Sequence, residues 1–294
     1  LIEDHLILSF YFHLFLFSII LLLYFFDLII HLAANVGGLF KNMRHNYNML
    51  QDNIAINSNV LESCIETNVT KGIFILSSCI FPKNPKKFPM TEDMLHNSEP
   101  HPSNEGYSYS KRLLEIQCRL SNKDNNTNFL CLTPVNLYGP YDNYDPKNSH
   151  VIPGIIQRFH KEKQTENNLY VAYGTGKPLR QFLYAPDFAK IILDSLFTLV
   201  CKDTLTIQHM ICCSDTELTL KKTVNIIGEI MDIDKNKIVF DTSWSDGCMK
   251  KTVYNSLLKT VFPNFIFTDF RKGLTESYHW FIHNEVKSKV YKIN

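Results

Sequence analysis

The residues best suited to chemistry in this chain include a tyrosine and a lysine four positions apart. Tyr107 and Lys111 form a Y-x-x-x-K motif, and helical spacing would place the phenol and the ammonium one turn apart on the same face. A nearby ammonium favours the phenolate, so we expect the pKa of Tyr107 to fall toward the range useful for proton exchange with a ketone or alcohol. On its own the motif is weak, and an exposed Tyr beside an exposed Lys is the plainer interpretation.

The surroundings of this pair strengthen the catalytic interpretation. Ser77 ends a buried apolar run thirty residues upstream of Tyr107, and residues 134–140 (PVNLYGP) end another run downstream. The carboxyl ends of parallel strands meet at one edge of a sheet, so Ser77, Cys79 and Asn136 are expected along that edge. Serine, tyrosine and lysine brought together there could reduce a carbonyl group. The hydroxyl would position the oxygen, the phenol would protonate it, and the ammonium would hold the phenol and a ribose.

The elements that must position these groups alternate along the chain. Apolar runs at 27–34, 72–78 and 128–136 predict buried parallel strands, and residues 46–66 and 108–120 predict the helices between them. This alternation predicts an α/β fold with a doubly wound parallel sheet. In the rest of the chain we expect helices at 150–163, 187–200, 219–231 and 272–281, and strands at 169–173 and 205–212.

Composition excludes several other classes of protein. The 294 residues, 45% hydrophobic and 20% charged, indicate one large or two unequal globular domains and exclude long disorder. A net charge of +1 gives no electrostatic case for nucleic acid as a partner. The eight cysteines form no C-x-x-C pair and no cluster at zinc spacing, so we predict no metal site and expect reduced thiols in a cytosolic protein.

The first residues do not match the rest of the chain. Residues 6–26 carry no charge and are long and apolar enough for a transmembrane helix, although Glu3 and Asp4 precede them and no signal-peptide cleavage site follows. Three interpretations stay open: a membrane anchor, a buried apolar segment, and a start that is not native to the protein.

Seven segments, taken in order, resemble the extended short-chain dehydrogenase/reductases and, within them, the GDP-L-fucose synthase family. They are HLAANVGGLFKN (31–42), SSCIFP (77–82), GYSYSK (106–111), PVNLYGPYDN (134–143), HVIPG (150–154), YGTGKPLRQF (173–182) and DGCMKK (246–251). The resemblance implies a Rossmann-like NADP-binding domain at 27–145, with contributions from about 180–200, and a smaller α/β substrate-binding domain at 146–294. Residues 1–26 stand apart as an anomalous hydrophobic segment.

The resemblance also implies a role for individual residues. The catalytic serine, tyrosine and lysine fall on Ser77, Tyr107 and Lys111, and a pair that epimerises the sugar falls on Cys79 as base and His150 as acid. A thiol and an imidazole have suitable pKa values for this work near neutrality. The expected cofactor contacts are Ala33, Ala34, Lys111, Pro134, Val135, Asn136, Leu137 and His150. The expected substrate contacts are Arg158, Tyr173, Arg180 and Asp246.

The activity implied is the NADPH-dependent 3,5-epimerisation and 4-reduction of GDP-4-keto-6-deoxy-D-mannose to GDP-L-fucose, by a cytoplasmic homodimer. Two alternatives stay open. One is another nucleotide-sugar epimerase or dehydratase of the same class, although dehydratases carry an acidic pair after the serine where Cys79 stands here. The other is an inactive pseudoenzyme, associated with the membrane through residues 6–26.

One departure from the family bears on the cofactor. The family begins with a strand, a glycine-rich turn and a helix whose N-terminus binds the NADPH pyrophosphate. Only 26 residues precede Asp27 here, and they contain no glycine. We therefore interpret the chain as a truncated form of the Rossmann domain, and expect this polypeptide as written to bind NADPH poorly or not at all and to fold poorly.

Overall fold

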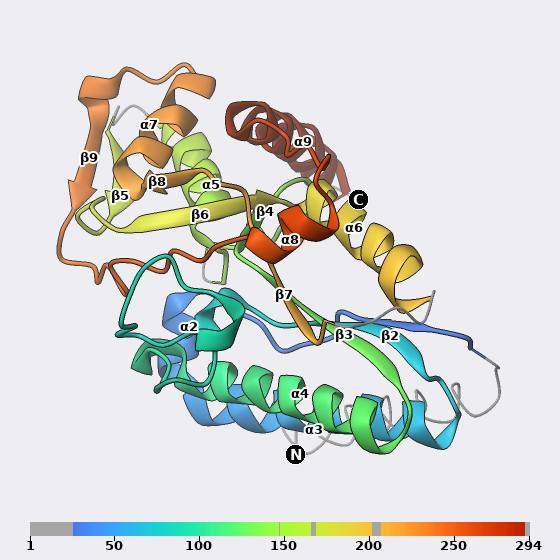
Figure 1. Cartoon of the computed structure of the whole chain (residues 1–294). Coiled ribbons are helices and arrows are strands. Elements are labelled where there is room, and N and C mark those ends of the chain that lie inside the picture. Colours follow the sequence, from blue (N-terminus) through green and yellow to red (C-terminus); the bar gives the residue numbers. More distant parts are fainter. Residues whose placement is uncertain (1–25, 147, 166–168, 202–206, 292–294) are drawn as a thin grey trace, which may run out of the picture.

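A four-stranded parallel sheet forms the centre of the structure. The computed structural model describes residues 26–146, 148–165, 169–201 and 207–291. The strand order is β1 (Ile29–His31), β2 (Lys71–Ile75), β3 (Asn128–Pro134) and β7 (His209–Cys212), and all neighbours are parallel. Helices α3 (Asn46–Glu66) and α4 (Glu105–Asp124) cover one face and α6 (Ala185–Ser195) covers the other (Figure 1). The doubly wound α/β fold expected from the sequence is confirmed.

Smaller sheets and helices build the remainder. Strand β4 (Asn136–Tyr138) pairs in parallel with β6 (Leu179–Tyr184), which pairs antiparallel with β8 (Glu217–Thr219). Strand β5 (Tyr170–Tyr173) pairs with β9 (Ile238–Asp241). The other helices are α2 (Leu39–Arg44), α5 (Val151–Lys163), α7 (Leu220–Ile230), α8 (Ser256–Val261) and α9 (Phe270–Tyr291), and the short turns are η1 (Ser78–Ile80), η2 (Glu92–Met94), η3 (Pro102–Asn104), η4 (Leu196–Val200) and η5 (Lys235–Lys237).

The expected strands are longer than the observed ones, and the differences matter for the site. The run expected at 128–136 divides at Val135, so that Asn136 begins a strand of a different sheet. The run expected at 72–78 ends as a strand at Ile75, and the chain then turns into η1. Ser77 caps this turn, because its hydroxyl accepts a hydrogen bond from the Cys79 backbone N–H at 3.5 Å. A polar side chain that bonds its own backbone competes with the sheet ladder.

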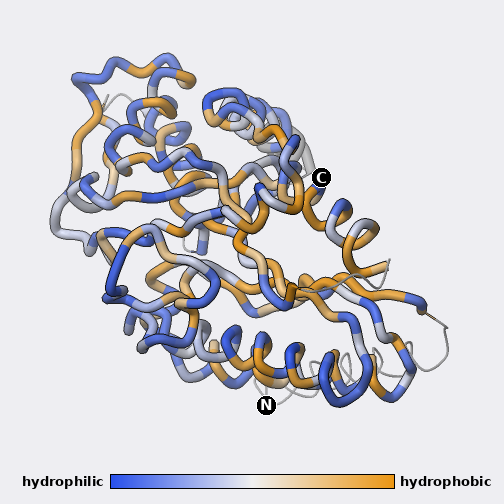
Figure 2. Tube along the Cα trace, in the orientation of Figure 1, coloured by the Kyte–Doolittle hydropathy of each residue, from blue (hydrophilic) through white to orange (hydrophobic). Residues whose placement is uncertain are grey.

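Two separate hydrophobic cores stabilise the structure. The first contains Phe74, Phe129, Leu114 and Ile191, which lie between the parallel sheet and its helices. The second gathers around α5, β6, α7 and α9, and its members include Phe159, Phe182, Ile227 and Leu274. Figure 2 traces both as hydrophobic stretches on the strands and on the inner helix faces. Because β7 and α8 pack on the first core, later residues than 180–200 contribute to it. The division into two domains stays a prediction.

The apolar N-terminal segment, interpreted from the sequence as a membrane anchor, a buried segment or a non-native start, lies outside the described residues, which begin at Phe26. None of the helices formed by the described residues is long and apolar enough to cross a bilayer.

Two buried histidines of the first core are held in the neutral form. His209 on β7 bonds the Thr133 hydroxyl at 2.5 Å, and His31 on β1 bonds Asn57 at 3.0 Å. Burial lowers the pKa of His209 to about 3 and that of His31 to about 4. In the unfolded chain an imidazole titrates near 6.5, so the unfolded state binds more protons as the pH falls below that value.

We expect acid to destabilise the protein through these two side chains. Their contribution is fully present above pH 6.5 and is lost as the pH falls toward 4. Each histidine adds up to about 1.4 kcal/mol per pH unit to the slope of the unfolding free energy. Urea unfolding from pH 7 to pH 4.5 measures that slope. His209→Gln should reduce it, and the same substitution at exposed His279 should not; an unchanged slope in His209→Gln would contradict this account.

Candidate active site

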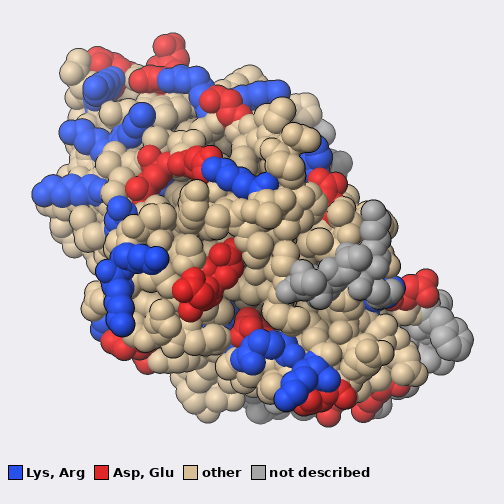
Figure 3. All heavy atoms as spheres, in the orientation of Figure 1, with Lys and Arg blue, Asp and Glu red and all other residues tan. Residues whose placement is uncertain are grey.

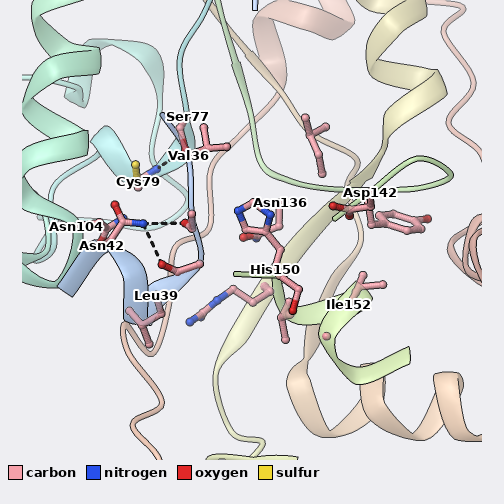
Figure 4. Close-up of a pocket in the computed structure, with 18 of the residues that line it drawn as sticks. Val36, Leu39, Asn42, Ser77, Cys79, Asn104, Asn136, Asp142, His150 and Ile152 are labelled. Carbon is pink, nitrogen blue, oxygen red and sulfur yellow. Dashed lines mark hydrogen bonds between the residues drawn. The ribbon is translucent and has the colours of Figure 1, made fainter. Parts of the chain in front are cut away.

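A cavity of about 1240 Å³ lies at the carboxyl end of the parallel sheet, bordered by α2, η1, α4 and α5. Figure 4 shows Ser77 and Cys79 entering it from the side of β2, and His150 from the start of α5. Every residue expected to be catalytic lines this one cavity, namely Ser77, Cys79, Tyr107, Lys111 and His150. The structure therefore brings together side chains that lie up to 73 positions apart in the sequence.

Tyr107 and Lys111 lie on the first turns of α4, at the spacing that the sequence predicted. The Lys111 Nζ donates to the Ile75 carbonyl oxygen at 2.8 Å and lies 6.0 Å from the centre of the Tyr107 ring. The carbonyl group of Ile75, the last residue of β2, thus holds the Lys111 ammonium near the Tyr107 ring. One of the three ammonium donors is used in this bond, which leaves two for other acceptors in the cavity.

The pKa of Tyr107 differs from the expectation. Burial raises it, with a smaller contribution from Cys79, instead of the fall expected from the neighbouring ammonium. Burial also lowers the pKa of Lys111 to about 8, because a desolvated ammonium is less stable. The reason for the error is that desolvation outweighs the ion–phenol attraction when both groups are enclosed. A protonated phenol is the form that can donate a proton to a ketone oxygen.

Gly106 sets the position of Tyr107 through a close contact between α3 and α4. Its N–H donates to the Asn46 Oδ1 at 2.6 Å, and a Cβ at this position would lie 2.0 Å from the Asn46 carbonyl oxygen. The two helix starts can approach this closely only because residue 106 has no side chain.

We expect Gly106→Ala to force these helix starts apart. Overpacking against backbone should cost about 1–3 kcal/mol of stability and displace Tyr107 from the cavity. Thermal unfolding and turnover measured on the same preparation test this. Glu105→Gln, at the exposed neighbouring position, is the control that should leave the melting temperature nearly unchanged. A Gly106→Ala protein as stable as the parent would contradict the close-contact argument.

Cys79 and His150 approach the cavity from different elements. The Cys79 carbonyl oxygen accepts from the Ser108 hydroxyl at 3.0 Å, which ties η1 to α4 and orients the thiol. His150 is the residue immediately before α5, and Asp142 lies beyond it in Figure 4. Burial raises the pKa of Asp142 and the His150 charge opposes this rise. A thiol and an imidazole facing one enclosed space can remove and return protons on a single ligand.

Most of the expected cofactor contacts also line the cavity. Ala34, Pro134, Val135, Asn136 and Leu137 do so, but Ala33 does not, because it lies in the exposed segment after β1. The Asn136 amide donates to the Gln181 carbonyl oxygen at 2.8 Å, which links β4 to β6 beside the cavity.

The donors of this lining fit the nicotinamide ribose of NADPH. The buried Lys111 ammonium keeps two donors for ribose hydroxyls, and Val135 and Leu137 offer apolar contacts to a planar ring. These residues would hold the reactive end of the cofactor, which supplies a hydride when bound.

The four residues expected to contact the substrate lie together at another part of the lining. The Arg158 Nη1 donates to the Val171 carbonyl oxygen at 3.0 Å, and the Arg180 Nη1 donates to that of Leu179 at 2.8 Å. Burial lowers the pKa of both guanidinium groups, and the ion pairs of the described residues include neither. Two guanidinium groups that line one cavity and make no ion pair among the described residues suit the binding of an anion.

Asp246 makes contacts that the sequence did not predict. Its Oδ1 accepts from the Thr175 N–H at 2.7 Å, and its Oδ2 accepts from the Thr175 hydroxyl at 2.6 Å. The carboxylate therefore joins the loop after β9 to the turn after β5. Each oxygen keeps a second lone pair for a ligand hydroxyl.

Three further residues of the lining were missed in the sequence: Asp142, Trp244 and Lys251. Asp142 and Lys251 stand inside the PYDN and DGCMKK segments, so their positions gave a usable signal. Trp244 is one of only two tryptophans in the chain and stands two residues before the DGCMKK segment. Its contact with Tyr173 is formed only in the folded chain and left no signal in the sequence.

One face of the molecule carries charged side chains of both signs. On the face drawn in Figure 3, Lys and Arg side chains alternate with Asp and Glu instead of forming a basic stripe. Mixed charges of this kind do not favour binding to a polyanion.

A parallel α/β sheet with a Ser-Tyr-Lys set in a cavity at its carboxyl edge defines a class of enzymes that carry out redox chemistry or epimerisation with a nicotinamide cofactor. Residues 20–198 match the model of the NAD dependent epimerase/dehydratase family. The chain belongs to this family of NAD(P)-binding enzymes.

Individual relatives of the chain have more specific names than the family. The chain is 41% identical over 256 residues to the GDP-L-fucose synthase of Dictyostelium discoideum, covering 87% of this chain and 78% of that protein. It is 38% identical over 264 residues to the probable GDP-L-fucose synthase of Drosophila melanogaster, covering 87% and 80%. Among solved structures, a GDP-L-fucose synthetase from Naegleria fowleri bound to NADP matches with a TM-score of 0.77 at 32% identity, covering 88% of this chain and 78% of that one.

Proposed function

We propose that this protein converts GDP-4-keto-6-deoxy-D-mannose to GDP-L-fucose with NADPH, by inverting C3 and C5 and then reducing C4. The observation that carries the proposal is a single cavity lined both by Ser77, Tyr107 and Lys111 and by a thiol and an imidazole, Cys79 and His150. A reductase alone needs only the first set. The names of its relatives support the same reaction and substrate class.

Epimerisation uses the acidity of carbons next to a ketone. The Cys79 thiolate removes the proton from C3 or C5, and the electron pair moves into the C4 carbonyl to give an enolate. The His150 imidazolium then returns a proton to the same carbon from the opposite face. After each inversion the thiol and the neutral imidazole exchange protons with solvent, which restores their starting forms.

Reduction uses the other set of side chains. The Ser77 hydroxyl and the Tyr107 phenol hold the C4 oxygen, and the phenol donates its proton to that oxygen as C4 receives a hydride. Lys111 keeps the phenol oriented and stabilises the phenolate that forms. The enclosed guanidinium groups of Arg158 and Arg180 bind the diphosphate, which holds the sugar ring at a fixed depth.

The alternatives considered from the sequence are less well supported. A dehydratase would need an acid after the serine, and Ser78 and Cys79 follow Ser77 here. A membrane-anchored pseudoenzyme would not need a complete set of reducing and epimerising side chains in one cavity.

The experiment is to incubate the purified chain with GDP-4-keto-6-deoxy-D-mannose and NADPH. At NADPH concentrations high enough to offset the weak binding expected from the sequence, we expect loss of NADPH absorbance and a product that matches GDP-L-fucose by chromatography and proton NMR. NADPH oxidation with retained configuration at C3 and C5 would assign the chain to the simple 4-reductases instead. A chain that binds the sugar nucleotide but oxidises no NADPH would contradict the reductive step.

We further infer that the protein is a cytoplasmic homodimer. All eight cysteines are free thiols, which suits a reducing compartment. The proposed cofactor and substrate, NADPH and a GDP-sugar, are available in the cytosol. Light scattering after size-exclusion chromatography should give twice the mass of the chain at micromolar concentration. A mass equal to one chain would exclude the dimer.

A further inference from the structure

Four side chains from four different segments form a continuous stack in the wall of the cavity. The Arg158 guanidinium of α5 lies 3.7 Å from the centre of the Tyr173 ring at the end of β5. Tyr173 stacks on Trp244, with ring centres 4.5 Å apart and an interplanar angle of 18°. Trp244 in turn meets the edge of Phe40 of α2 at 5.0 Å and 71°. All four residues line the cavity.

Both faces of the Tyr173 ring are occupied in this stack. A guanidinium at 3.7 Å and a nearly parallel indole at 4.5 Å cannot share one face of a phenol ring, so they lie on opposite sides. Tyr173 is therefore unavailable for stacking on a base or sugar, although 41% of its surface is exposed. The Tyr173 ring instead lies between the Trp244 indole and the Arg158 guanidinium, so the position of the indole determines that of the guanidinium.

Trp244 is fixed by contacts of its own. The Ser243 hydroxyl and N–H hold the pKa of the Asp241 carboxyl, at the end of β9, below its usual value, and the Trp244 side chain adds a smaller contribution. Two residues further on, Asp246 ties the same loop to Thr175 through two hydrogen bonds. Because β9 pairs with β5, the loop that carries Trp244 leaves the sheet beside the strand that ends at Tyr173.

The group at the end of the stack is a cation, the Arg158 guanidinium, that is not part of any ion pair among the described residues. The Arg158 Nη1 bonds the Val171 carbonyl oxygen. A guanidinium held flat on an aromatic face keeps its in-plane N–H donors free for an anion. A diphosphate presents two neighbouring anionic groups to such a fork.

We propose that Trp244 is a positioning residue for diphosphate binding: through Tyr173 it holds Arg158 at the angle that engages the diphosphate of the sugar nucleotide. This inference rests on the proposed function for its substrate class. It assigns a role to a residue outside the expected catalytic and binding set, and it makes the stack, instead of the Arg158 side chain alone, the unit that determines affinity.

The test measures GDP binding by calorimetry in a double-mutant cycle. Trp244→Leu keeps an apolar side chain but removes the aromatic face, and Trp244→Phe restores one. We expect Trp244→Leu to weaken GDP binding about tenfold and Trp244→Phe to stay within about twofold of the parent, because only an aromatic side chain at 244 keeps the Tyr173 ring in place against the guanidinium. In an Arg158→Ala background, Trp244→Leu should have almost no further effect.

Turnover separates positioning from a general structural effect. Trp244→Leu should raise KM by a similar factor and leave kcat within about twofold, because none of the stacked side chains is a proton donor or base in the proposed reaction. The matched control is Trp280→Leu on α9, which should change neither constant. Thermal unfolding of each variant confirms that the fold is kept.

Several outcomes would overturn the proposal. Equal losses of affinity from Trp244→Leu in the parent and in the Arg158→Ala background would mean that Trp244 acts independently of Arg158. A fall in kcat without a change in KM would place its effect on the chemical step. If the parent binds GDP and shows the cycle but catalyses no reduction, only the proposed function fails; if the parent binds no GDP, both fail.

Discussion

Replacing Tyr107 with Phe should lower kcat for the reduction by about a thousandfold, within the range usual for the loss of a positioned proton donor. The substitution removes one oxygen and leaves the ring that packs beside Lys111 and Cys79. The C4 oxygen would then have no group to protonate it as the hydride arrives. KM should change little, because the phenol is not among the groups proposed to hold the diphosphate. Stopped assays of NADPH oxidation at saturating substrate measure the effect.

The matched control is Tyr109→Phe on the same helix. Tyr109 is 40% exposed and lies against Arg112 outside the cavity, so its hydroxyl should be dispensable. A Tyr107→Phe protein that keeps more than about a tenth of the parent kcat would remove Tyr107 from the role of proton donor, given the contribution expected of such a group.

The second large effect concerns epimerisation. Cys79→Ser should reduce the exchange of the C3 and C5 protons with solvent by about a thousandfold, because a hydroxyl is far less acidic than a thiol and cannot act as the base near neutrality. The exchange is measured by NMR in deuterated water without NADPH, so the reductive step does not enter. His150→Gln should impair the same exchange, since it removes the group that returns the proton.

The two halves of the reaction should separate cleanly in this assay. Tyr107→Phe should still incorporate deuterium at C3 and C5, whereas Cys79→Ser should not. Cys201→Ser provides the control thiol, because Cys201 lies at the end of η4 and does not line the cavity. Full deuterium incorporation by Cys79→Ser would show that another base performs the epimerisation and would exclude our assignment for this thiol.

The sequence by itself determined the architecture and the candidate chemistry. Apolar runs separated by amphipathic segments are sufficient to predict a parallel α/β sheet, because burial on both faces requires continuous hydrophobic strands. The helix at Asn46–Glu66 has the predicted limits. Parallel topology then places the strand ends on one edge of the sheet. For this reason the sequence was sufficient to group Ser77, Tyr107 and Lys111 in one site. The motif segments added Cys79 and His150.

Tertiary structure alone decided the environments of those side chains. The pKa of Tyr107 is raised instead of lowered, because desolvation depends on the whole enclosure while the sequence gives only the i, i+4 ammonium. The division of the run at Val135 and the exposure of Ala33 were likewise not encoded in local pattern. The contact of Trp244 with Tyr173 joins positions 71 residues apart in the sequence. Local periodicity fixes which face of an element is buried, but only packing between distant segments fixes what each buried group meets.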